Sequence, residues 1–296
     1  MKKGVVICMK KLKIETKQKM IGFAFVSPWI IGFILFSAYP LLYSLYMSFN
    51  KVKISGDKLK MQWVGFANYN KALFQDAEIT NSLIKVLQNT IIIIPIIVVF
   101  AIIMALLLNE EFKGRSLIRA IFFLPVLLTS GNLIESLTAQ GQGSISFLKS
   151  DTINNLIAGI GGSWGDTLKA VLDSFLIILW YSGIQMLILI AGMQSINPSV
   201  YEAATIDGAG KWESLWLITL PNLMPFILLS TIYTIVDQFT APFSKIMNVI
   251  KWHTQNVKTG YGYASAIAFL YFLVIMAVIG VAALLFRKSI TNKRGR

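Results

Sequence analysis

The stretch Tyr201-Glu202-Ala203-Ala204-Thr205-Ile206-Asp207-Gly208-Ala209 is polar and broken by glycine, and it lies between two long apolar runs. Residues 171–193 precede it and residues 220–239 follow it. Each run is long enough to cross a bilayer as a helix, which takes about twenty mostly apolar residues. A short polar segment between two such runs predicts a loop at one surface of a membrane. The stretch therefore indicates a helical membrane protein and marks a place where its chain meets water.

The composition of the whole chain supports this interpretation. Of 296 residues, 55% are hydrophobic and 14% are charged, and the mean hydropathy is +0.66. A soluble domain has about a quarter charged residues, so this chain cannot cover a globule with polar surface. The fold class we predict is all-α: an integral membrane bundle of six transmembrane helices, at residues 21–49, 89–108, 120–138, 171–193, 220–239 and 263–286.

Charge predicts the orientation of the bundle. Six spans put both termini on one side, and most Lys and Arg residues lie on that side, so we expect it to be the cytoplasm. The first outer loop runs against this bias with Lys51, Lys53, Lys58, Lys60, Lys71 and Lys85. A net charge of +13 would suggest nucleic acid in a soluble protein. Because these basic residues flank apolar runs, we expect contacts with membrane lipid and no nucleic-acid partner.

No linker divides the chain, so we predict one transmembrane domain. It covers residues 21–286 of a multi-pass protein of the cell membrane, between basic cytoplasmic tails at 1–20 and 287–296. Its fourth connection, about 196–220, contains the opening stretch. There Ser199 fits an N-cap with Glu202 completing a capping box, and Gly208 and Gly210 suit a left-handed turn. A second short helix at 211–217 would precede Pro221, which opens the fifth span.

This connection resembles the EAA loop of permease subunits in binding-protein-dependent ABC importers of the carbohydrate-uptake type, the maltose and glycerol-phosphate permease kind. Glu-Ala-Ala at 202–204, Asp-Gly-Ala at 207–209, and Ile218-Thr219-Leu220-Pro221 followed by Pro225 carry the resemblance. Tyr39-Pro40-Leu41 and Lys113-Gly114-Arg115 resemble other parts of that family. Thr240-Ala241-Pro242-Phe243 departs from it, because the family usually has Gly-Gly-Pro after the fifth span.

The resemblance implies a mechanism and a set of partners. The loop would dock on an ATPase, with the coupling residues Glu202, Ala203, Ala204, Asp207, Gly208, Ala209 and Pro221. The implied complex holds a second, similar permease, two copies of the ATPase and an extracytoplasmic solute-binding protein. Gly210-Lys211 is followed by Trp212 and lacks the phosphate-binding loop pattern, so ATP should be bound and hydrolysed by the separate subunit. We therefore expect no enzyme activity, cofactor or metal site in this chain.

Polar residues inside the spans are candidates for the solute pathway. Tyr181 and Gln185 share a face of the fourth span, and Tyr233 and Asp237 share a face of the fifth. Amides suit sugar hydroxyls and aromatic rings suit the C–H surface of a sugar. Hydrogen bonding between helices is the alternative role for all four.

Two alternatives for the function remain open at this stage. The first is an ABC permease for another small solute, such as glycerol phosphate, an amino acid or a polyamine. The spans at 120–138, 171–193 and 220–239 hold no Lys or Arg, which favours a neutral sugar or oligosaccharide over an anion. The second is an ion-gradient-driven secondary transporter, which would be expected to show inverted repeats and acidic ion sites at mid-membrane.

Overall fold

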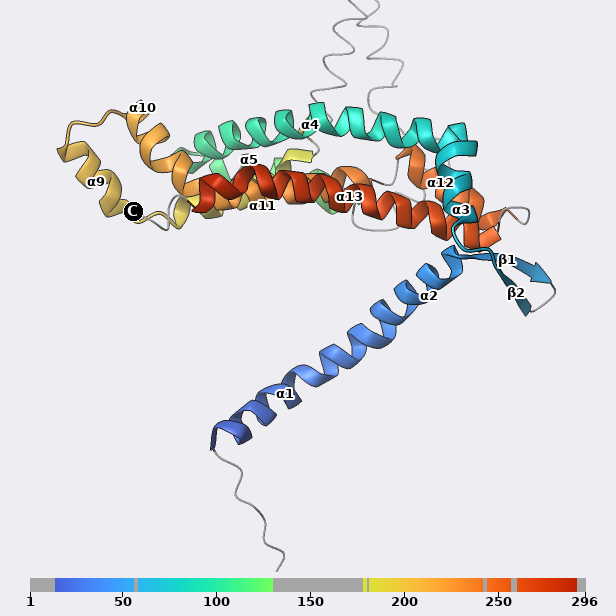
Figure 1. The fold of residues 1–296 in the computed structure, drawn as a ribbon. Coiled ribbons are helices and arrows are strands. Elements are labelled where there is room, and N and C mark those ends of the chain that lie inside the picture. The colour runs from blue at the N-terminus through green and yellow to red at the C-terminus, as the bar shows by residue number, and fades with distance from the viewer. Residues whose placement is uncertain are drawn as a thin grey trace, which may run out of the picture.

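The computed structural model describes residues 14–55, 58–129, 178–179, 181–241, 244–256 and 260–291. Helices make up most of this part of the chain (Figure 1). The elements in chain order are α1 (Ile14–Phe33), the π-helical turn η1 (Ile34–Ala38), α2 (Tyr39–Ser48), β1 (Asn50–Ser55), β2 (Lys58–Trp63), α3 (Ala67–Asn70), the π turn η2 (Lys71–Gln75), α4 (Ala77–Asn109), α5 (Arg115–Thr129), α9 (Pro198–Ile206), α10 (Lys211–Ser214), the π turn η3 (Leu215–Thr219), α11 (Leu220–Thr240), α12 (Lys245–Gln255) and α13 (Gly260–Thr291).

The predicted membrane-helix class is confirmed. Within the described residues, four helices are long and apolar enough to cross a membrane: Lys19–Ser48, Ala77–Asn109, Lys211–Thr240 and Gly260–Arg287. The predicted span at 120–138 begins in α5, and its residues 130–138 lie outside the described residues. The span at 171–193 is described mainly as the apolar helix Tyr181–Gln194. The count of six therefore stays a prediction.

Two π-helical turns occur directly before prolines. Pro40 and Pro221 are each the second residue of a helix, α2 and α11. In both places the residue before the proline bonds five positions back: Tyr39 N–H to the Ile34 carbonyl, and Leu220 N–H to the Leu215 carbonyl. A proline has no N–H and its ring crowds the carbonyl four residues earlier, so a widened turn accommodates it.

The core lies where α4, the Tyr181–Gln194 helix, α11 and α13 pack together. Small residues allow close approach: Ala101 and Ala105 on α4 are fully buried. At Gly192 a side-chain Cβ would lie 2.6 Å from the Phe226 ring of α11, so glycine is what lets these two helices meet. Figure 1 shows α4, α11 and α13 running side by side, in agreement with their contacts.

Helices α1 and α2 form one long rod that leaves the bundle (Figure 1). None of the 18-residue apolar window in Lys19–Ser48 is buried within the chain. Its large apolar side chains include Phe25 and Phe36, each 83% exposed, and exposing such side chains to water is unfavourable. Such a surface is stable only against lipid or another protein.

The "hairpin end" is our name for β1, β2, α3, α12 and the first turns of α13, which gather at one end of the bundle (Figure 1). Strands β1 and β2 pair antiparallel, from Asn50 opposite Trp63 to Ser55 opposite Lys58. The predicted all-α class holds for the bundle, and this loop adds a short hairpin that the sequence analysis did not predict. In it, lysine alternates with apolar residues and gives the two-residue period of a strand. Helix α12 is likewise an element that the sequence analysis did not predict.

Candidate functional site

The candidate site is the exposed connection at 197–210, which we call the elbow. It contains α9 and the turn that leads into α10 and lies at the end of the bundle opposite the hairpin (Figure 1). The side chain of Asn197 accepts a hydrogen bond from the Ser199 N–H at 3.1 Å, which makes Asn197 the N-cap. The prediction of Ser199 as N-cap with Glu202 is wrong. Proline suits the first helical position, so α9 begins at Pro198 instead of after it.

In the turn after α9, one of the two glycines that were predicted to be left-handed has that conformation. Gly208 has φ of +85°, and the Ala209 N–H donates to the Ala204 carbonyl at 2.9 Å while the Gly208 N–H donates to Thr205. This is the Schellman pattern, which needs a left-handed residue. Gly210 has φ of −74° and is instead the N-cap of α10, where its N–H donates to the Glu213 carboxylate at 2.6 Å. The prediction of a left-handed Gly210 is therefore wrong.

The predicted separate helix at 211–217 is also corrected. Helix α10 continues through η3 into α11, so Lys211–Thr240 forms one unbroken helix. Pro221 lies inside its membrane-spanning part, just after the π turn. The widened turn lets the helix pass the proline without ending, so the elbow is joined to a core helix through continuous helical turns.

The elbow surface combines acidic and apolar groups. Glu202, Ala203, Asp207 and Gly208 are exposed, and Ala204 and Ala209 are half-buried. Ile206 is 86% exposed. Trp212 and Trp216, one turn apart on the following helix, are 70% and 54% exposed and meet edge to face. An exposed apolar patch rimmed by charges is the usual mark of a protein interaction surface.

Two contacts connect the elbow and α10 to the bundle. The Tyr201 hydroxyl lies 3.0 Å from the Thr219 hydroxyl, joining α9 to the π turn below α11. Lys211 Nζ lies 3.8 Å from a Glu110 carboxylate oxygen just after α4. Both partners of this ion pair are largely exposed, so it contributes little, about 0–1 kcal/mol.

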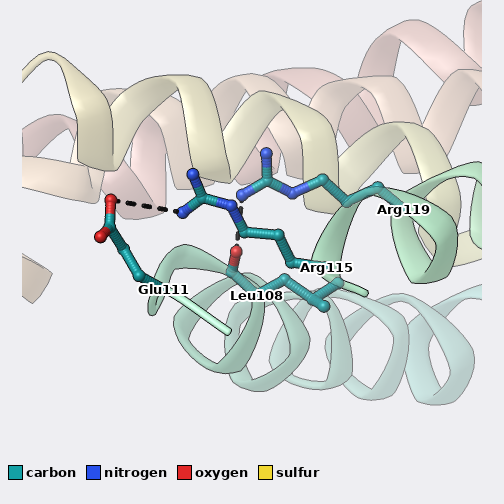
Figure 2. A network of polar contacts seen from close by, with 4 residues as sticks. All are labelled: Leu108, Glu111, Arg115 and Arg119. Atoms are coloured by element: carbon teal, nitrogen blue, oxygen red, sulfur yellow. Dashed lines mark hydrogen bonds and ion pairs between the residues drawn. The ribbon is translucent and has the colours of Figure 1, made fainter. Parts of the chain in front are cut away.

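The loop that carries Glu110 is itself anchored by arginines (Figure 2). Arg119 from α5 donates to the Leu108 carbonyl at 2.6 Å, satisfying one of the free carbonyls at the end of α4. Arg115 lies 3.8 Å from Glu111. The end of α4, the start of α5 and the start of α10 therefore form one connected surface.

The predicted pathway residues separate into two groups. Tyr181, on the Tyr181–Gln194 helix, and Tyr233 and Asp237, one turn apart on α11, are all half-buried, and Asp237 is near enough to both tyrosines for its charge to act on them. Gln185 is 1% exposed and its Nε2 has no hydrogen-bond partner among the described residues. It lies inside the helix interface, although it shares a helical face with Tyr181.

Sequence analysis missed other polar groups near this interface. Ser182, Ser230 and Thr234 are fully buried, and Thr234 donates to the Ser230 carbonyl at 2.8 Å. Hydroxyl residues four apart in an apolar helix were the available signal. Across the described ranges, no group of three or more His, Cys, Asp or Glu residues is placed to hold a metal ion.

Membrane-spanning helices around a shared core, with an exposed elbow at one end, define a multi-pass membrane protein. Residues 77–293 match the family model of the binding-protein-dependent transport system inner membrane component. The chain belongs to this family of transport permease subunits.

Several sugar-transport permeases are similar in sequence. The arabinooligosaccharides transport system permease protein AraP of Halalkalibacterium halodurans is 31% identical over 238 residues, covering 75% of this chain and 69% of that protein. The multiple sugar-binding transport system permease protein MsmF of Streptococcus mutans is 29% identical over 280 residues, covering 86% and 91%.

A solved structure has the same fold. It is a chain from a bacterial alginate ABC transporter in complex with an alginate pentasaccharide-bound periplasmic protein. The TM-score is 0.66 at 22% identity, and the match covers 94% of this chain and 98% of that one.

Proposed function

We propose that this chain is a permease subunit of an ATP-driven importer that moves a sugar or oligosaccharide across the cell membrane. The observation that carries the proposal is the exposed elbow, which is joined through a continuous helix to the core of a membrane bundle. The relatives named for arabinooligosaccharide and multiple-sugar transport support the sugar class.

The elbow is the proposed docking site for a separate ATPase that binds and hydrolyses ATP. The proposed coupling residues are Glu202, Ala203, Ala204, Asp207, Gly208, Ala209 and Pro221. Glu202 and Asp207 present charge, and Ile206 presents an apolar side chain that is 86% exposed. An ATPase cleft that receives α9 would cover this apolar surface and pair the acidic groups.

The proposed complex contains a second permease, two copies of the ATPase and an extracytoplasmic solute-binding protein. The rod of α1 and α2 is an observation in favour of a second permease, because none of its apolar window is buried in the described structure. We place the elbow and both termini in the cytoplasm. Helix α13 runs from the hairpin end toward the end of the bundle that carries the elbow (Figure 1), and the basic tail that follows it in the sequence fits the cytoplasmic side.

Tyr181, Gln185, Tyr233 and Asp237 are the proposed polar surface of the solute pathway. The grouping of Asp237 with two tyrosines supports a site that binds sugar hydroxyls. Buried Gln185 would reach a solute only in another state of the bundle, in which the Tyr181–Gln194 helix moves relative to α11.

The test is uptake by the reconstituted complex of both permeases, the ATPase and the binding protein. Glu202→Lys reverses the exposed charge, so we expect the membrane complex to form without stable ATPase attachment and without ATP-driven uptake. Lys60→Glu also reverses one exposed charge by two units, at the hairpin end away from the elbow, and should keep uptake. Normal uptake and ATPase attachment in Glu202→Lys would refute the docking proposal. Uptake that continues without ATP and stops with ionophores would support an ion-driven transporter instead.

A further inference from the structure

Helix α9 is held to the bundle by a chain of hydroxyl groups. The Tyr201 and Thr219 hydroxyls are 3.0 Å apart, and the Thr219 hydroxyl lies 3.3 Å from the Ser214 carbonyl. A carbonyl can only accept, so Thr219 donates to Ser214 and Tyr201 donates to Thr219. Hydrogen bonds in such a chain strengthen one another. No residue of α9 is buried, so this side-chain link is not duplicated by core packing of α9.

The link ends at the π turn of the long helix. Thr219 is the last residue of η3 and is only 7% exposed. Both the Thr219 hydroxyl and the Leu220 N–H bond to carbonyls five residues back, at Ser214 and Leu215. Pro221 follows and supplies no N–H. Short π turns in helices are uncommon and frequently occur at functional sites.

We propose that Tyr201 and Thr219 are positioning residues that transmit movement of the elbow to α11, with η3 as the point where the helix yields. This inference rests on the proposed function. A displacement of α9 by the ATPase would pull on Thr219 and change the spacing of the π turn. Because α11 carries Tyr233 and Asp237, the shift would reach the polar pathway residues directly. The elbow surface then determines docking, and the hydroxyl link determines how much transport each docking movement produces.

The experiment measures moles of solute imported per ATP hydrolysed in proteoliposomes that contain the full complex. A maltooligosaccharide and an arabinooligosaccharide, each with a binding protein that accepts it, serve as the probes. Tyr201→Phe and Thr219→Val each remove one hydroxyl and keep the side-chain shape. We expect ATPase attachment to persist and the transport ratio to fall about two- to ten-fold, the range for one net hydrogen bond. The double variant should match either single variant, because both break the same link.

Two controls separate transmission from general damage. Thr219→Ser keeps the hydroxyl and should restore the ratio. Thr254→Val removes a threonine hydroxyl that bonds within α12, at the hairpin end, and should leave the ratio unchanged.

Three results would overturn the inference: unchanged ratios in both single variants, additive losses in the double variant, or loss of the ATPase from the complex. The last result would assign Tyr201 to docking. These outcomes are independent of Glu202→Lys, whose failure to affect uptake or attachment would instead remove the proposed function.

Discussion

The two ends of the bundle are stabilised in different ways. At the hairpin end, Asn68 Nδ2 donates to the backbone oxygens of Ser48 and Asn50, and the Ser48 hydroxyl lies 2.6 Å from that of Tyr69. Segments distant in sequence also meet there, since the Tyr263 hydroxyl donates to Asp76 at 2.9 Å.

The elbow end has mostly local bonds and an exposed surface. Its caps at Asn197 and Gly208 bond only to neighbours in sequence, and an added Cβ at Gly208 would meet nothing within 4 Å. Large apolar side chains are exposed at both ends, among them Trp63 and Trp252 at the hairpin end and Ile206 at the elbow. What differs is the bonding, which joins segments distant in sequence at the hairpin end and mostly neighbours at the elbow. Under the proposed function, the elbow is the end that a partner covers. Equivalent changes at the two ends should therefore have different consequences, in stability at one and in transport at the other.

The largest loss of stability is expected from Gly262→Ala at the hairpin end. A Cβ there would overlap the Asn50 carbonyl oxygen and lie 3.0 Å from the Met47 oxygen. Backbone oxygens of α2 and β1 cannot move aside as a flexible side chain would, so we expect a loss of about 1–3 kcal/mol or more. Thermal unfolding of the purified protein in detergent measures it. Gly280→Ala, also in α13 but with open space around it, is the matched control and should not lower the unfolding temperature.

At the elbow, Gly208→Val should have the opposite profile. A β-branched residue at φ of +85° disfavours the turn by about 1–2 kcal/mol, but α9 has no buried residues, so global unfolding should change little. ATP-driven uptake should fall sharply because the turn positions Glu202 and Asp207. Gly208→Asn, which tolerates left-handed backbone, should keep most of the uptake. A large drop in unfolding temperature for Gly208→Val would contradict the contrast between the ends.

A smaller effect is expected when the bond between α13 and the Asp76 segment is removed. Tyr263→Phe deletes the hydroxyl that donates to Asp76 but keeps the ring, over which Lys71 Nζ lies at 4.5 Å. Asp76 is only half-buried, so water can take the place of the tyrosine hydroxyl, and the loss should be about 1 kcal/mol or less. Unfolding temperatures of Tyr263→Phe and of Tyr261→Phe, two residues earlier, give the comparison. Equal temperatures would show that water replaces the tyrosine hydroxyl.

Features that depend on residues close together in the sequence were the ones that could be predicted. The apolar runs and Gly208 depend on local chemistry, and both were predicted from sequence alone. The N-cap was misplaced because Ser199 and Asn197 are both good caps, and the first-turn preference of Pro198 decided between them. The hairpin carried its own signal in Lys51-Val52-Lys53-Ile54 and Lys58-Leu59-Lys60-Met61, an alternation that charge counting alone overlooked.

Tertiary packing explains the rest. Tyr181 and Gln185 share a helical face, yet Gln185 is buried while Tyr181 is half-buried. The close approach of Gly192 to Phe226 brings the Tyr181–Gln194 helix against α11, and no helical period reveals that partner. The link between Tyr201 and Thr219 likewise spans 18 positions and depends on how the elbow folds back.

The smallest expected effect is a pH dependence at the hairpin end. His253 on α12 is 6% exposed between the rings of Trp252 and Tyr263, and this burial lowers its pKa below the ordinary 6.5. Nearby Asp76 and Glu78 act to raise that pKa and Lys71 acts to lower it, but burial is the largest cause. The unfolded chain therefore binds a proton more readily than the folded one, so His253 contributes stability above about pH 6.5 that is lost as pH falls toward the lowered pKa.

Unfolding temperatures measured from about pH 8 to about pH 5.5 should decline in the native protein, across the range in which histidine titrates. His253→Phe keeps an aromatic ring and removes the titration, so the difference between the two curves isolates His253 from nearby carboxylates. The unfolding temperature of the native protein should fall relative to that of His253→Phe as the pH is lowered. The same pH series on Gly208→Val should follow the native curve, because the elbow contributes nothing to the packing around His253. If the Gly208→Val curve instead differed in shape from the native curve, a change at the elbow would have altered the titration of His253, and the two ends would not be independent.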